Sequence, residues 1–113
     1  MAYDELLSMR FRDVLGDTPQ LSEKRMMGGL CFLYQGNMIG GADRSKDGHG
    51  RFLFRVGKDR EAEALTRAGT AVLVQGGRRM GGFVHVDADA CDEALLRDLT
   101  GLALDFVKSL PAK

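Results

Sequence analysis

The C-terminal segment carries a one-sided apolar pattern, and this pattern limits the fold more than any other feature of the sequence. Its apolar residues recur at helical spacing: Leu95, Leu96, Leu99, Leu102, Ala103, Phe106, Val107 and Leu110. Such spacing is typical of an amphipathic helix with one buried stripe. We expect Asp89 to cap the start of this helix and Pro111 to end it. Because the stripe must be buried against another element, the chain needs a second layer of structure.

A second amphipathic helix is predicted at the N-terminus. The apolar positions that define it are Tyr3, Leu6, Leu7, Phe11, Val14 and Leu15. Asp4 and Glu5 fall in its first turn, where carboxylates complement the helix dipole. Gly16 is expected to end the helix in the left-handed conformation, and Pro19 prevents its continuation.

Short apolar runs separated by glycine-rich segments lie between these helices and predict strands. The segment from Leu21 to Gly29 is expected to be extended and to enter the sheet. The predicted strands are 30–35, 38–42, 51–57, 71–75 and 83–87. Gly36-Asn37 predicts a two-residue hairpin turn, because such turns need positive φ. Between residues 76 and 82 either glycine pair could form the turn, and the sequence leaves that register open.

A short helix is predicted between the third and fourth of these strands, capped by Asp59, running through Arg67 and ended by Gly69. The order is therefore helix, three strands, helix, two strands, helix. We expect an α+β fold in which a mainly antiparallel sheet forms one layer and the helices pack on one side of it. The 113 residues are expected to form a single domain, 1–113.

Composition and charge exclude some classes of protein. Sixteen basic and sixteen acidic residues give a formal net charge of zero, which argues against a general polycationic coat for nucleic acid. A balanced total charge is still compatible with a local basic patch. The acidic start Met1–Glu5 does not resemble a secretory signal, and no apolar run approaches the roughly 20 residues that span a bilayer. We therefore expect a cytoplasmic protein with no membrane partner.

Catalytic motifs are absent, so we expect no enzyme activity, no cofactor and no metal. The glycine spacing at 76–82 lacks the Lys and Ser/Thr of a phosphate loop, and turn glycines are favoured there. His49 and His85 would need to converge with an acid to hold a metal. Cys31 and Cys91 lie in apolar patterns and are expected to be buried, reduced thiols.

The most suggestive feature is a partial repeat. Segments 25–30 and 79–83 both place arginine and methionine just before a glycine pair and an apolar strand. The candidate binding residues are Lys24, Arg25, Gly28, Gly29, Arg78 and Arg79. If the two segments lie side by side, their cations form a patch suited to phosphate or carboxylate groups. The alternative is that the glycines form turns while the arginines stand in water or pair with Glu23 and Asp87.

Several fragments together resemble the TfoX N-terminal domain family, related to the TfoX/Sxy regulators of bacterial natural competence. These fragments are 23–32, 36–38, 54–57, 77–87 and 106–111. The chain departs from the family pattern at Met27, where an aromatic is usual, and at Arg79 and Gly81, where proline and lysine are usual. The resemblance implies a stand-alone N-terminal domain whose fold is similar to type III secretion chaperones. It implies no established reaction.

Two functions follow as expectations. The first is a non-enzymatic regulatory or adaptor module that presents the basic segments to a protein partner or to nucleic acid. The second is a protein, or an undetected enzyme, that holds a small anionic ligand with the same arginines. A third expectation is a structural homodimer whose only interface is the apolar run at 30–34.

Overall fold

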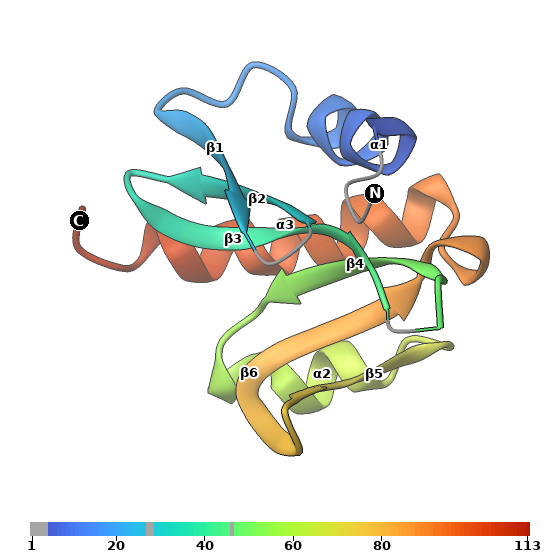
Figure 1. Cartoon of the computed structure of the whole chain (residues 1–113). Coiled ribbons are helices and arrows are strands. Elements are labelled where there is room, and N and C mark those ends of the chain that lie inside the picture. The colour runs from blue at the N-terminus through green and yellow to red at the C-terminus, as the bar shows by residue number, and fades with distance from the viewer. Residues whose placement is uncertain (1–4, 27–28, 46) are drawn as a thin grey trace.

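The computed structural model describes residues 5–26, 29–45 and 47–113, which form one sheet and three α-helices (Figure 1). The elements in chain order are α1 (Glu5–Leu15), β1 (Leu21–Met26), β2 (Gly29–Tyr34), β3 (Asn37–Arg44), β4 (Gly50–Arg55), α2 (Glu61–Leu65), β5 (Thr70–Gln75), β6 (Arg78–Asp87) and α3 (Glu93–Lys108). Short 3-10 turns, Lys58–Arg60 and Ala88–Ala90, precede α2 and α3.

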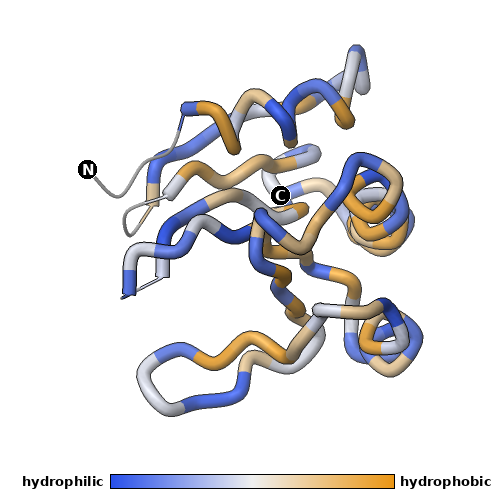
Figure 2. The backbone as a smooth tube through the Cα atoms, turned by 90° about the vertical axis from the view of Figure 1, so that its right-hand side faces the viewer, coloured by the Kyte–Doolittle hydropathy of each residue, from blue (hydrophilic) through white to orange (hydrophobic). Residues whose placement is uncertain are grey.

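The sheet has six strands in the order β1-β2-β3-β4-β6-β5, and every neighbouring pair is antiparallel. The predicted α+β class and the order of helices and strands are confirmed. The segment expected to be extended from Leu21 is itself an edge strand, β1, which pairs with β2 from Leu21 opposite Tyr34 to Met26 opposite Gly29. Figure 2 shows α2 and α3 on one side of the sheet and the β5–β6 hairpin extending toward the other.

One face of the sheet is covered by helices, and it carries the core. Its buried residues include Leu30, Phe32, Ala42, Phe52, Phe54, Val84 and Val86. Phe11 of α1 is fully buried on this face, with its ring stacked 4.9 Å from Phe32 and 5.6 Å from Phe54. The alternation predicted for residues 51–57 is confirmed, since Phe52, Phe54 and Val56 are all fully buried.

The helix starts differ from those predicted. The cap of α3 is Asp92, whose carboxylate accepts a hydrogen bond from the Leu95 amide at 2.8 Å. Asp89 lies instead in the 3-10 turn that carries the chain off β6. Asp59 is likewise in a 3-10 turn, and α2 starts at Glu61 without a side-chain cap. In both places the chain must first turn away from its strand, which moves the helix start downstream.

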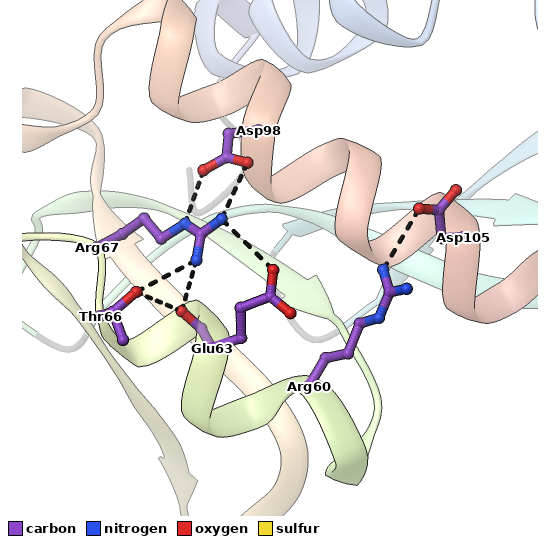
Figure 3. A network of polar contacts seen from close by, with 6 residues as sticks. All are labelled: Arg60, Glu63, Thr66, Arg67, Asp98 and Asp105. Carbon is purple, nitrogen blue, oxygen red and sulfur yellow. Dashed lines mark hydrogen bonds and ion pairs between the residues drawn. The ribbon is translucent and has the colours of Figure 1, made fainter.

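Salt bridges join the segments just before and just after α2 to α3 (Figure 3). The guanidinium of Arg67 makes two hydrogen bonds to the carboxylate of Asp98, at 2.7 and 3.2 Å. Arg60 reaches Asp105 at 3.3 Å. The Arg67 hydrogen bonds hold the pKa of Asp98 below its usual value. Because these carboxylates are largely exposed, each pair adds little to stability.

The β2–β3 turn lies one residue before the predicted one. Its left-handed residues are Gln35, at φ 50°, and Gly36, at φ 83°. Asn37 opens β3 opposite Tyr34, and its buried side chain donates a hydrogen bond to the Pro111 carbonyl at 2.9 Å. This long-range bond draws Asn37 into the strand, and a local turn pattern cannot anticipate it.

The β5–β6 turn, which the sequence left open, uses the first glycine pair. Gly76 and Gly77 have φ of 59° and 77°, and Gln75 pairs with Arg78.

Both cysteines are buried free thiols, as predicted. Within the described ranges, no helix combines the length and apolarity required to cross a membrane.

Candidate functional site

The second face of the sheet, which we call the open face, faces the viewer in Figure 1, with α3 behind the strands. Cross-strand partners share a face, so the register identifies its residues. One row across it consists of Lys24, Cys31, Gly41, Leu53, His85 and Ala71. The open face therefore combines apolar positions with cations and a histidine.

A cavity of about 190 Å³ indents the open face. Apolar side chains form its floor, where Cys31, Leu53 and Leu73 are 8%, 6% and 3% exposed. Its lining also includes three methionines, Met26, Met38 and Met80. We call this cavity the methionine hollow. Its floor is nearly as buried as the core, although it lies on the face opposite the one that carries Phe11.

Curvature of the sheet creates the methionine hollow. Met26 is on edge strand β1 and Met80 is on β6, with three strands between them. In a flat sheet four strand steps would separate them by about 19 Å, yet both line one cavity. The sheet is therefore concave on its open face. Val72 of β5 pairs with Val84 of β6, but Val74 pairs with Arg79, so β6 has extra residues between these pairs. These extra residues form a bulge, and β6 bends there (Figure 1).

A buried carboxylate holds the bend in β6. Glu61 of α2 is 8% exposed, and one of its oxygens accepts a hydrogen bond from the Gly82 amide at 2.7 Å. The other oxygen pairs with the Arg79 guanidinium. The Gly82 carbonyl in turn accepts a hydrogen bond from the Val56 amide at 2.9 Å. Glu61 thus ties α2 to the bulged part of β6, two residues after Met80.

We expect Glu61→Ala to lower the free energy of unfolding by about 1–3 kcal/mol, because it leaves the buried Gly82 amide without an acceptor. Glu61→Gln retains an oxygen acceptor and loses only the ion pair to Arg79, whose side chain is 62% exposed. We therefore expect Glu61→Gln to lower the free energy of unfolding by less than Glu61→Ala does. Urea unfolding followed by circular dichroism measures both variants, and equal losses would contradict this role for the Gly82 bond.

The predicted binding residues are divided between the two faces. Lys24 and Arg25 are adjacent in β1, and Arg78 and Arg79 are adjacent in β6, so each pair points to opposite sides. Arg79 reaches Glu61 on the covered side. Gly29 lines the methionine hollow. Gly28 lies outside the described residues. The two repeated segments share the methionine hollow, which Met26 and Met80 both line.

The cations on the open face flank the methionine hollow. Lys24 is opposite Cys31 on the floor, and Arg78 is opposite Gln75, which also lines the cavity. Neither cation forms an ion pair with any of the described residues. In each segment a cation precedes a methionine by two residues, and this spacing puts both on one face of a strand. The prediction from sequence missed this spacing because it treated the four cations of the two segments as a single patch.

The remaining polar groups near the methionine hollow are neutralised or uncharged. Asp43 and Arg51 form an ion pair at 2.8 Å, and their side chains are only 16% and 15% exposed. Burial lowers the pKa of His85, and the charge of Arg51 lowers it further. Burial raises the pKa of Cys31, so its thiol stays protonated. Among the residues that the structure describes, no three His, Cys, Asp or Glu side chains gather as a metal site.

Comparison with known proteins gives one match. A family model described as the TfoX N-terminal domain matches residues 13–107, which is most of the chain. That range includes every described residue of the methionine hollow and both flanking cations. No match was found among curated proteins or among solved structures.

Proposed function

Because the chain belongs to the TfoX N-terminal domain family, we propose that it is a regulatory module without catalytic activity, which works by binding a small apolar ligand in the methionine hollow. The observation that carries this proposal is the buried apolar floor on a face without helices. Cys31, Leu53 and Leu73 are each less than a tenth exposed there. A concave apolar pocket with few polar groups is the usual form of a ligand site.

The size and lining of the methionine hollow indicate the size of its ligand. Its volume of about 190 Å³ is below the roughly 300–1,000 Å³ of pockets for drug-sized molecules. It is somewhat larger than the roughly 150 Å³ engineered cavity that binds benzene. One aromatic ring or a short aliphatic group would fill it. Methionine side chains are flexible and polarisable, so they can adapt to such a group.

The residues around the methionine hollow support binding without catalysis. Burial raises the pKa of the Cys31 thiol and the charge of Asp43 raises it further, so the thiol stays protonated and is a poor nucleophile. Asp43 is itself held in the ion pair with Arg51. His85 has a lowered pKa, and its Nδ1 atom is buried with no hydrogen-bond partner among the described residues. Among the described residues that surround the methionine hollow, no nucleophile and base are therefore aligned.

Methionine methyl resonances test the proposed site directly. We expect hydrocinnamyl alcohol, a neutral phenyl compound, to shift the methyl signals of Met26, Met38 and Met80 in a saturable way. Met9 lies on α1, is 48% exposed and serves as an internal control whose signal should not move. Shifts spread equally over Met9 would indicate non-specific binding and would contradict the proposal.

A matched pair of variants locates the ligand further. Met80→Lys puts a charge on the lining of the methionine hollow, and we expect it to weaken binding of hydrocinnamyl alcohol at least about tenfold, because an apolar ligand bound there would take water away from the ammonium group. Val74→Lys places the same charge on the same hairpin at a site that is 54% exposed and opposite Arg79. Binding by this control should match the unaltered protein. Equal affinities for all three proteins would rule out the methionine hollow.

Nucleic acid and protein partners are the competing proposals. Phosphate contacts would make binding fall steeply as salt is added. Nucleic acid would be favoured over a small ligand if the protein slowed the migration of DNA in a gel, if added salt abolished this shift, and if Arg78→Met abolished it as well. A dimer through the open face would bury Met26 and Met38. Sedimentation at micromolar concentration distinguishes such a dimer from a monomer.

A further inference from the structure

The methionine hollow is apolar inside but electrically one-sided at its margin. Lys24 and Arg78 are both exposed on the open face, one on β1 and the other on β6. Lys24 is opposite Cys31, a residue of the floor, in the pairing of β1 with β2. The carboxylate that also lines the cavity, Asp43, is compensated by Arg51 at 2.8 Å. Lys24 and Arg78 are thus the charged groups beside the cavity that form no ion pair with the described residues.

We infer that the ligand is a small carboxylic acid with an aromatic or short aliphatic body, whose carboxylate is held by Lys24 or Arg78 at the margin of the methionine hollow. This inference rests on the proposed function. The apolar body would lie over Leu53 and Leu73, and the charged end would stay at the surface. Both ends of the ligand then meet their chemical complement, and neither cation has to leave water.

Size and charge favour a carboxylate over a nucleotide. A cavity of about 190 Å³ is too small for a base, a sugar and a phosphate together. Phosphate groups are usually held by several donors, such as backbone amides at a helix start or a glycine-rich loop. Lys24 and Arg78 instead stand on separate strands at either side of the cavity. A single charge on an apolar body fits this arrangement.

Three compounds with one phenylpropyl skeleton test the inference: hydrocinnamate, hydrocinnamyl alcohol and the corresponding amine. We expect the acid to bind roughly two- to fivefold more tightly than the alcohol at low salt, as an exposed ion pair would give. The amine should bind more weakly than the alcohol. The advantage of the acid should shrink as salt is added, because the charges at the margin are exposed to solvent. Titrations are followed on the methyl signals of Met26, Met38 and Met80.

Variants identify the cation. Lys24→Met and Arg78→Met each remove one charge, and we expect at least one of them to bring the affinity for the acid down to that for the alcohol. The affinity for the alcohol should not change in either. Arg97→Met removes one charge from the outer surface of α3, where Arg97 pairs with Glu93, and serves as the control for net charge. This control should retain the preference for the acid.

The outcomes separate this inference from the proposed function. Equal binding of acid and alcohol would overturn the carboxylate assignment and leave the proposed site intact. A preference for the acid that survives both Lys24→Met and Arg78→Met would also overturn it. If none of the three compounds shifts the methyl signals of the methionine hollow, the proposed function fails together with the inference. Tighter binding of the acid that is lost in a variant supports both.

Discussion

Phe11→Ala is expected to lower the free energy of unfolding by about 3–5 kcal/mol. The Phe11 ring is fully buried and packs α1 against the core face of the sheet. It stacks against Phe32 at 4.9 Å and Phe54 at 5.6 Å. Truncation would remove these ring contacts and leave a cavity that neighbouring strands cannot fill without distorting the sheet. Urea unfolding monitored by circular dichroism measures the loss as a fall in the transition midpoint.

Leu6→Ala is the matched control for Phe11. Leu6 lies in the same helix but is 72% exposed, so its truncation removes little buried area. We expect a change within about 0.5 kcal/mol, as for most surface substitutions. A loss for Phe11→Ala no larger than that for Leu6→Ala would mean that α1 is not packed on the sheet as described.

Gly40→Ala is expected to cost about 3 kcal/mol or more. A Cβ atom at this position would lie 2.1 Å from the Leu53 carbonyl oxygen and 3.2 Å from the Phe54 Cα. Both are backbone atoms of the paired strand β4, so relief requires the strands themselves to move. Inserting atoms into a packed interior commonly costs about 1–3 kcal/mol and occasionally more, through shifts of side chains and backbone. The larger value is expected here, with the same urea measurement as its test.

Gly101→Ala provides the opposite control. Gly101 is exposed in α3, and a Cβ there would meet nothing within 4 Å outside its own helix. Alanine is the better helix former, so we expect this variant to be more stable by about 0.5–1 kcal/mol. If Gly40→Ala proved as stable as the unaltered protein or as Gly101→Ala, the close approach of β3 to β4 would be contradicted.

Much of the fold follows from local patterns. The helical spacing that ends at Leu110 predicts α3, and Gly16 adopts the left-handed conformation expected of a helix stop, with φ of 56°. The alternation of Phe52, Phe54 and Val56 predicts their burial, which the structure confirms. Such patterns are readable because each depends on neighbours along the chain. The predicted caps at Asp59 and Asp89 were wrong, since the start of a helix also depends on how the chain leaves the preceding strand.

The candidate site depends on contacts between distant segments. The sequence singles out both repeated segments, but it does not show which of their side chains share a face with the cavity. Glu61 illustrates the difficulty, because an unremarkable acid in a short helix proves to hold Arg79 and the Gly82 amide. Asn37 is similar, since its partner is the carbonyl of Pro111, 74 positions away.

Periodicity along the chain was thus sufficient for the class of fold, the order of its elements and the composition of its core, because apolar side chains must be removed from water wherever they recur on one face. The concave open face is different. It arises from a bulge in β6 and a buried carboxylate from α2, neither of which leaves a periodic trace. Met26 and Met80 line one cavity because the folded sheet curves, and that curvature is a property of the packed molecule.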